Sequence, residues 1–179
     1  MLRLWVALSA VAWAAAPPQE APEDNREYKA WASLKPRSWV KWKVETQTGA
    51  MKIQSELTTT LLRLSPDKAV LEDKTVVSIG DASRDHTAIR EVPSKLRKGT
   101  NGEGDKIEVA KEGDEELEIK GIKLRCHWIE TKLTDQPGAS VRVWTTDGVV
   151  GGCAKRVTKH DEAGKMGQTM TVVDWDKAE

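Results

Sequence analysis

Residues 115–132 read EELEIKGIKLRCHWIETK and decide the fold. The two-residue loop Lys120-Gly121 has Gly in second position, which suits a type I′ hairpin with φ > 0. Closing this loop sets Leu117 opposite Leu124, while acidic residues of the first strand face basic residues of the second. One face is then apolar and the other carries opposite charges. A slip of one residue would break both faces, so the pattern predicts an antiparallel pair in this register.

A second hairpin extends the pair toward the C-terminus. Pro137-Gly138 fits the centre of a type II turn, because Pro presets φ and Gly accepts a positive φ. The turn predicts that Trp128 pairs with Trp144 and Glu130 with Arg142. We expect the Trp pair to lie on the apolar face, with the ion pair near its rim. A Gly-rich reversal then leads into a further strand at 153–159.

A third hairpin is expected at residues 38–64. A two-residue loop at Thr48-Gly49 pairs Val44 with Ile53. Again one alignment satisfies an apolar face and a charged face together. Further strands are predicted at 69–79, 87–92, 107–110 and 169–175, separated by a polar turn at 81–85, a Gly-rich loop at 98–106 and a turn at 161–167, and the last strand is expected to pair with 153–159.

The fold class expected is mainly β, with about nine or ten antiparallel strands and one short helix within 26–34. Each strand has one apolar face, so the sheet must curl or be covered. We expect a curved half-barrel or a closed barrel in preference to a two-sheet sandwich. Residues 26–179 are expected to form one β domain, preceded by a signal peptide at 1–14 and a disordered leader at 15–25.

The N-terminus has the pattern of a secretory signal peptide. Arg3 precedes an apolar run that is too short to span a bilayer, which takes about 20 residues. Cleavage is expected after Ala14, with Ala16 as the less favoured site. We therefore expect an exported protein, periplasmic or extracellular, with no integral membrane segment after the signal is removed.

Charge and aromatic content narrow the function. The chain has 28 basic and 28 acidic residues, which argues against a nucleic-acid partner. It has eight Trp, one Tyr and no Phe, so Trp must supply the large side chains of the core. Abundant Trp therefore does not by itself indicate a ligand site.

No motif for catalysis or metal binding is found. The three His residues (His86, His127, His160) lack a metal-ligand spacing, and no nucleophile elbow or phosphate loop occurs. We expect no catalytic residue, metal or cofactor. Two interpretations of the two Cys residues remain open, a disulfide bond and two free thiols. Export favours a disulfide, whereas the predicted register separates Cys126 and Cys153 by a middle strand, which is too far for one.

The candidate ligand-binding residues are apolar and gather on the predicted core face. The Trp pair could hold an apolar ligand in a concavity, although plain core packing is the favoured alternative. If a cavity exists, we expect it to be lined by Trp42, Ile53, Leu124, Trp128 and Trp144.

Three segments carry a resemblance to known proteins: 31–43 (WASLKPRSWVKWK), 90–96 (REVPSKL) and 143–155 (VWTTDGVVGGCAK). They resemble uncharacterised bacterial secreted β-rich proteins with a closing W-x-S-x-x-V-P-G-G-x-x-K motif, although Val150 replaces the motif's Pro and Thr146 stands near its Ser. The curled β pattern is also similar to lipoprotein-carrier half-barrels. The resemblance implies a fold and no activity.

The sequence therefore predicts an exported, non-enzymatic binding module for an apolar or lipid-like ligand. The alternative is a structural or protein-interaction component of the cell envelope, which would show an exposed apolar patch or an unpaired edge strand. An enzyme would require His127 or His160 to meet a carboxylate or a Cys in a cleft.

Overall fold

The computed structural model describes residues 23–79, 82–96, 108–133, 138–160 and 166–178. The expected signal peptide lies outside these residues. Within them, no helix is long and apolar enough to cross a membrane. The elements are β1 (Glu23–Asp24), α1 (Arg26–Ala32), β2 (Trp39–Thr48), β3 (Met51–Leu64), β4 (Lys68–Ile79), β5 (Ala82–Pro93), β6 (Lys95–Leu96), β7 (Glu108–Ile119), β8 (Ile122–Lys132), β9 (Ala139–Thr145), β10 (Cys153–His160) and β11 (Met166–Asp176).

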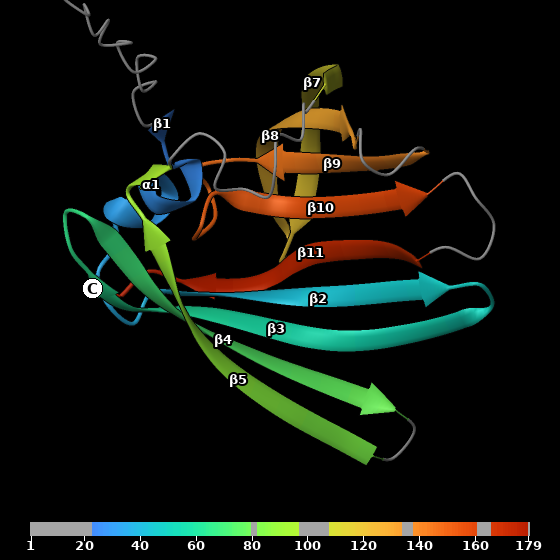
Figure 1. Cartoon of the computed structure of the whole chain (residues 1–179), viewed down its shortest axis with the longest axis horizontal. Helices are drawn as coiled ribbons and strands as arrows, with labels where there is room; N and C mark the ends of the chain where they lie inside the picture. Colours follow the sequence, from blue (N-terminus) through green and yellow to red (C-terminus); the bar gives the residue numbers. More distant parts are fainter. Residues whose placement is uncertain (1–22, 80–81, 97–107, 134–137, 161–165, 179) are drawn as a thin grey trace, which may run out of the picture.

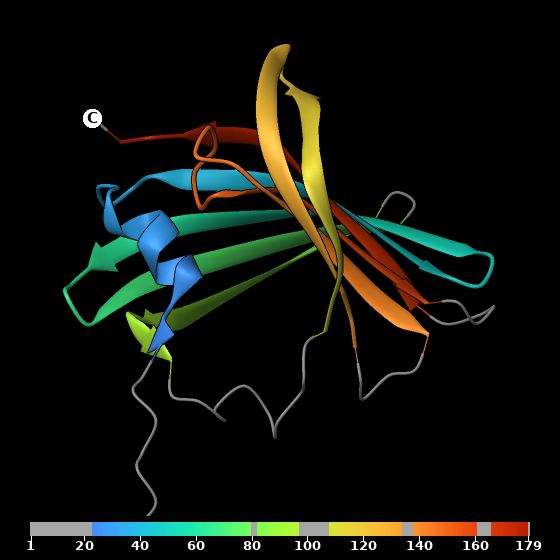
Figure 2. The same ribbon diagram turned by 90° about the horizontal axis from the view of Figure 1, so that it is seen from above.

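Nine strands form one open antiparallel sheet in the order β5-β4-β3-β2-β11-β10-β9-β8-β7 (Figure 1). The C-terminal strand β11 pairs with β10, as expected, and also with β2, so it joins the two halves of the chain. Seen from above, the β7–β8 hairpin crosses over the rest of the sheet (Figure 2). At its tip, Lys120 forms an ion pair with Asp174 of β11. The prediction of a curved antiparallel half-barrel is confirmed, and the sheet is not closed into a barrel.

The Lys120-Gly121 hairpin is confirmed pair by pair. Leu117 lies opposite Leu124, with Glu118 opposite Lys123. Lys120 has φ of 56° and Gly121 has φ of 74°, as a type I′ turn requires.

The predicted register between β8 and β9 is also correct. Trp128 lies opposite Trp144, and Glu130 lies opposite Arg142. Gly138 has φ of 81°, the value expected for the third position of a type II turn, although the preceding residues 134–137 are outside the described part.

The predicted register between β2 and β3 is wrong by two residues. Val44 lies opposite Ser55, and Ile53 lies opposite Thr46. The loop consists of Gly49 and Ala50, and Gly49 has φ of 59°. Gly therefore occupies the first central position, as in a type II′ turn, and not the second as we predicted. A shift of two residues leaves every side chain on its expected face, so the curled sheet survives the error.

Several element boundaries also need correction. Residues 82–85, expected in a turn, belong to β5, whereas Asp81 and the expected loop at 98–106 lie outside the described residues. The two short segments expected near 107–119 form the single long strand β7. Glu23 and Asp24, inside the leader expected to end at residue 25, form strand β1, because they pair with β6.

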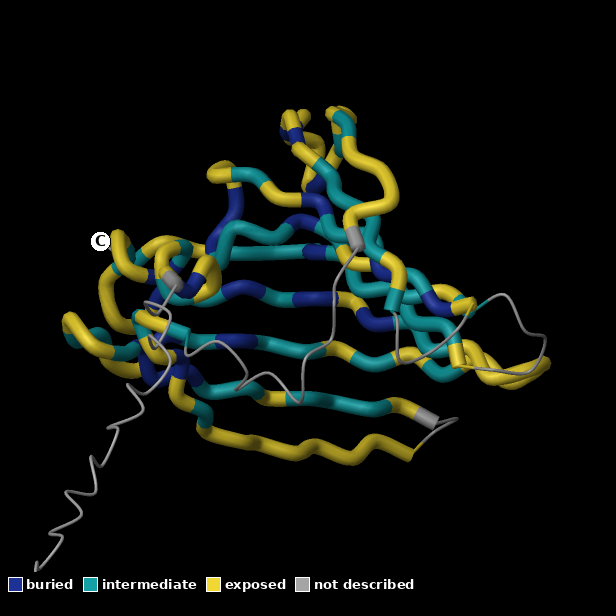
Figure 3. The backbone as a smooth tube through the Cα atoms, turned by 45° about the horizontal axis from the view of Figure 1, so that its top comes forward, coloured by how far each residue is buried: buried dark blue, intermediate teal, exposed yellow. Residues whose placement is uncertain are grey.

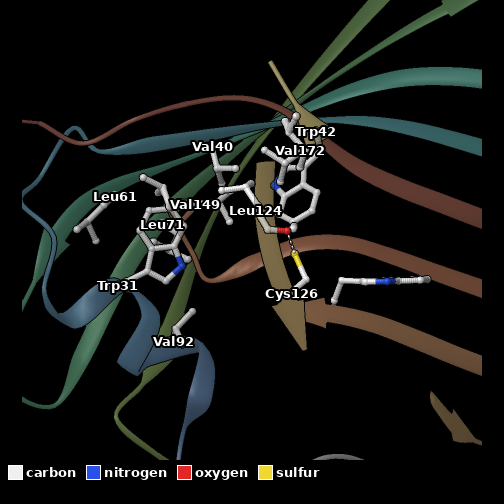
Figure 4. Packing of buried hydrophobic residues seen from close by; sticks show 14 of the residues in the cluster. Trp31, Val40, Trp42, Leu61, Leu71, Val92, Leu124, Cys126, Val149 and Val172 are labelled. Carbon is white, nitrogen blue, oxygen red and sulfur yellow. Dashed lines mark hydrogen bonds between the residues drawn. The ribbon is translucent and has the colours of Figure 1, made fainter. Parts of the chain in front are cut away.

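Helix α1 packs across one end of the sheet. Asn25 caps it, because the Asn25 side chain accepts hydrogen bonds from the backbone N–H groups of Glu27 and Tyr28. Trp31, only 2% exposed, projects from the helix into a cluster that includes Leu61, Leu71 and Val92 (Figure 4). A neighbouring part of the same core contains Trp42, Val172, Leu124, Cys126 and Val149 (Figure 4).

Burial is greatest in the middle of the sheet and under α1, and it falls off along β5 (Figure 3). Ten of the twelve β5 residues are exposed, and Ile89 is 66% exposed. The core therefore lies in the middle of the sheet and under α1, away from most of the edge strand β5.

Candidate functional site

A cavity of about 790 Å³ lies between α1, the 146–152 segment and the face of the sheet that α1 covers. We call this face the inner face. The apolar side chains that line the cavity come from α1 and from strands β2, β3, β8, β9 and β11. These apolar lining residues are Ala30, Trp31, Val40, Trp42, Leu57, Ile129, Val143 and Met170.

The floor of the cavity includes one row of side chains that runs across five neighbouring strands. Val44 on β2 pairs with Met170 on β11, which pairs with Arg156 on β10. Arg156 pairs with Val143 on β9, which pairs with Ile129 on β8. Directly paired residues share a face, so this row places one cation among four apolar side chains. All of them except Val44 line the cavity.

Charged side chains occupy the helix side of the cavity. The Arg90 guanidinium on β5 lies 2.7 Å from a Glu27 carboxylate oxygen on α1 and 2.6 Å from an Asp73 oxygen on β4. Burial acts to lower the pKa of Arg90, but the hydrogen bonds and charges of Asp73 and Glu27 outweigh it, and the net direction is upward. This ion-pair bridge holds α1 against the sheet.

Three further contacts fix the start of the helix. Asp24 forms ion pairs with Lys29 on α1 and with Lys95 on β6. Hydrogen bonds from Lys29 and then Lys95 lower the pKa of Asp24 to about 2. The Tyr28 hydroxyl donates to the backbone carbonyl of Ser65, 2.8 Å away.

Of the five residues expected to line a cavity, Trp42 does so. Trp128 and Trp144 do not, because strand alternation points them away from the inner face, on which Ile129 and Val143 lie. Leu124 packs in the core, and Ile53 stands near the far end of the β2–β3 hairpin. The expected lining set is therefore corrected to one shared member.

The Trp pair forms a cluster on the opposite side of β8 and β9 from Ile129 and Val143, and it packs against the hydrophobic core. The Arg142 guanidinium lies 4.3 Å from the Trp128 ring centroid and 5.6 Å from that of Trp144. Arg142 also donates two hydrogen bonds to Glu130. The Trp144 indole N–H donates to Glu115, 2.7 Å away, and Trp144 is 5% exposed. This arrangement has the character of core packing closed by charged groups.

A second cavity, of about 440 Å³, adjoins the first at His127. The His127 Nδ1 atom lies 3.3 Å from Asp114, and its Nε2 atom lies 3.9 Å from Glu112. The His127 side chain is about half exposed. Among the described residues, no group of three or more His, Cys, Asp or Glu side chains could hold a metal ion.

Both cysteines are free thiols in the structure. Cys126 is buried, and its pKa is raised by burial and then by the charge of Glu115. Burial raises the pKa of Cys153 to about 11. The predicted register, in which Cys126 and Cys153 both lie opposite Thr146 on the middle strand, holds along the strands but fails at these two residues. Cys153 lies opposite Thr145 at a β-bulge, and the β8–β9 pairing stops before Cys126.

Sequence reasoning missed Met170, Ile129, Val143 and Arg156 as cavity residues. Their alternation on β8, β9 and β11 was visible, but it could not tell which face of the sheet α1 covers. Arg156 was the signal that could have marked the cavity face. When the strands are paired, it is the one charged residue in a cross-strand row that is otherwise apolar.

The observations define an open antiparallel half-barrel with a partly open cavity beneath a short helix. No family model matches the chain, and no curated protein sequence matches it. Among solved structures, the chain shares its fold with the MucA/MucB complex of Pseudomonas aeruginosa, with a TM-score of 0.50 and 9% identity. The match covers 86% of this chain and 55% of that one, so this chain spans about half its length.

Two further structures overlap less well. A putative outer membrane lipoprotein-sorting protein domain from Vibrio parahaemolyticus has a TM-score of 0.34 and 10% identity over 85% of this chain and 89% of that one. A LolA superfamily protein from Nitrosomonas europaea has a TM-score of 0.29 and 7% identity over 86% and 91%. At these scores the overlaps carry no argument about function.

Proposed function

We propose that this protein is an exported, non-enzymatic module that binds an apolar or lipid-like ligand in the cavity beneath α1. The observation that carries the proposal is the cavity of about 790 Å³ with its lining of Trp42, Leu57, Ile129, Val143 and Met170. Ligand sites in proteins have volumes of about 300–1,000 Å³ and are lined mainly by apolar and aromatic groups.

The exposure of the cavity floor supports a ligand-binding site and not a closed hydrophobic core. Arg156 on the cavity floor is exposed, so water reaches the inner face. A ligand that covers apolar side chains exposed to water is bound more favourably, by about 25 cal/mol for each Å² of apolar surface buried. Thr59, Thr131 and Thr145 are polar members of the lining, and each of their hydroxyls donates a hydrogen bond within the chain.

Binding of the apolar dye Nile red tests the proposal. The V143W substitution puts a large ring into the cavity from its floor, and we expect it to abolish dye binding. The matched control I89W places the same ring on β5, where Ile89 is 66% exposed and outside the cavity lining, and should bind dye like the wild type. Undiminished binding by a folded V143W variant would contradict the proposal.

Export is part of the same proposal and has a separate test. A cut after Ala14 would leave a mature protein that begins at Ala15. Intact mass measurement of the protein from its native compartment gives the true N-terminus and any ligand retained. Recovery of the uncut chain from the cytoplasm would count against export.

A second candidate function is protein interaction at the sheet edge. Strand β5 ends the sheet, is largely exposed and carries Ile89 on its surface. The Pseudomonas aeruginosa structure of similar fold is itself a complex of two proteins. A partner on β5 would slow hydrogen exchange of the β5 amides in an extract of the cell envelope, and I89D should remove that protection while leaving Nile red binding unchanged.

A further inference from the structure

Arg156 has an unusual position on the inner face. Its direct cross-strand neighbours are Met170 and Val143, both apolar. Its diagonal neighbours on the same face carry no charge either; they are Gln168 and Val172 on β11 and Val141 and Thr145 on β9. An arginine therefore projects from an apolar surface at a point where the neighbouring strands supply no carboxylate.

Two other cations near the cavity, Arg90 and Lys29, are neutralised by acids of this chain. Arg90 contacts both Glu27 and Asp73, and Lys29 contacts Asp24. For Arg156, the described part of the chain provides no acidic side chain within ion-pair distance. Arg26 of α1 also lines the cavity and has no ion pair among the described residues, but it lies on the helix and not in the apolar row of the floor. Arg156 is thus the cation positioned to meet a charge brought by a ligand that lies on this floor.

The chemistry of the guanidinium sets the kind of charge. Its planar array of N–H donors matches the two oxygens of a carboxylate or the oxygens of a phosphate, and hydrogen bonds between ionised partners are the strong ones. The apolar side chains on both sides of Arg156 suit a hydrocarbon chain attached to such a head.

We infer that the cavity takes an anionic amphiphile, whose hydrocarbon chain covers the apolar floor and whose head group is bound by Arg156. This inference rests on the proposed function, since it uses the same cavity. It adds a head-group preference that an all-apolar pocket would lack. An uncharged amphiphile would bury the same floor and leave the arginine without a partner.

The experiment compares decanoate, decanol and acetate by calorimetry with the full-length mature protein. Wild type should bind decanoate about tenfold or more tightly than decanol, because a hydrogen bond to a charged group contributes about 1.5–3 kcal/mol. Acetate, which has the head without the chain, should not bind measurably. Added salt should weaken decanoate binding more than decanol binding.

The R156Q variant separates the head-group site from the cavity. Arg156 is exposed, so the variant should fold, and its thermal midpoint checks this. We expect R156Q to lose the preference for decanoate and to bind decanol like the wild type. The matched control R84Q removes an exposed arginine of β5 that does not line the cavity, and it should keep the preference.

Each failure has its own signature. Equal binding of decanoate and decanol by wild type, or an unchanged preference in R156Q, would overturn the inference and leave the apolar cavity standing. Acetate binding as tight as decanoate binding would also overturn it, because the chain would then play no part. If neither decanoate nor decanol binds, the proposed function fails together with the inference.

Discussion

Trp128 lies directly opposite Trp144 on neighbouring strands, and the Arg142 guanidinium lies over both rings on the side of β8 and β9 opposite Ile129 and Val143. The pair is therefore turned away from the cavity that lies against the inner face. Arg142 donates two hydrogen bonds to Glu130, which hold the guanidinium against the two rings.

Removing the cation should destabilise this cluster. We expect R142A to lose about 1–2 kcal/mol of unfolding free energy, because it removes a cation–π contact and leaves a partly buried Glu130 without its partner. Urea denaturation followed by far-ultraviolet circular dichroism measures the loss. The control R63A removes an exposed arginine of β3 and should change stability by less than about 0.5 kcal/mol. Equal values for the two variants would show that the cluster is not stabilising.

Position 151 requires glycine for two reasons, its positive φ and its close contact with Trp31. It has φ of 77°, and a Cβ atom there would lie 3.2 Å from Cζ2 of the buried Trp31. Gly49 has φ of 59°, and a Cβ atom at that position would have nothing within 4 Å. We expect G49A to lose about 1–2 kcal/mol from backbone strain alone, and G151A to lose more. Equal losses in thermal or urea unfolding would mean that the 146–152 segment does not pack on Trp31.

The hairpins at Lys120-Gly121 and at Gly49 show which parts of the strand register could be predicted from the sequence. At Lys120-Gly121 both loop residues have positive φ, and the predicted pairs were all found. At Gly49 the same residue type admits two turns, I′ and II′, which differ in register by two residues and leave both faces intact. The pattern of faces could not choose between them, because the side-chain period is two.

The cavity was harder to predict than the sheet. Alternation correctly separated Trp128 and Trp144 from Ile129 and Val143, but both faces of β8 and β9 carry apolar residues. Which of these two faces lines the cavity depends on where α1 lies, and that is set by contacts far apart in sequence, such as Glu27 with Arg90. The alternation of apolar and polar residues within a strand does not indicate such long-range contacts.

The ion pairs of Asp24 should make stability depend on pH in acid. The pKa of this carboxyl is lowered from 3.8 to about 2 in the folded protein, so folding favours its ionised form. The stabilisation is present above the unfolded value of 3.8 and is lost as the pH falls through about 2. The thermal midpoint of D24N should therefore lie below that of wild type at neutral pH and approach it in strong acid. A difference that persists at the lowest pH would exclude this origin.

Cys153 should react slowly with alkylating reagents in the folded protein. Burial raises its thiol pKa to about 11, and the thiolate is the reactive form. Cys126 is fully buried and should also be protected. Labelling with iodoacetamide at neutral pH, read by peptide mass spectrometry, should be slow in native protein and fast for both residues in urea. Rapid labelling of native Cys153 would contradict its raised pKa.

The proposed ligand site is tested most directly by the methyl signals of the methionines. Met170 lines the cavity, whereas Met51 and Met166 are 64% and 54% exposed and do not line it. We predict that decanoate or decanol, added to protein with carbon-13-labelled methionine methyl groups, shifts the Met170 nuclear magnetic resonance signal and leaves those of Met51 and Met166 in place. Saturating ligand that moves the Met51 or Met166 signal while Met170 stays unchanged would contradict binding beneath α1.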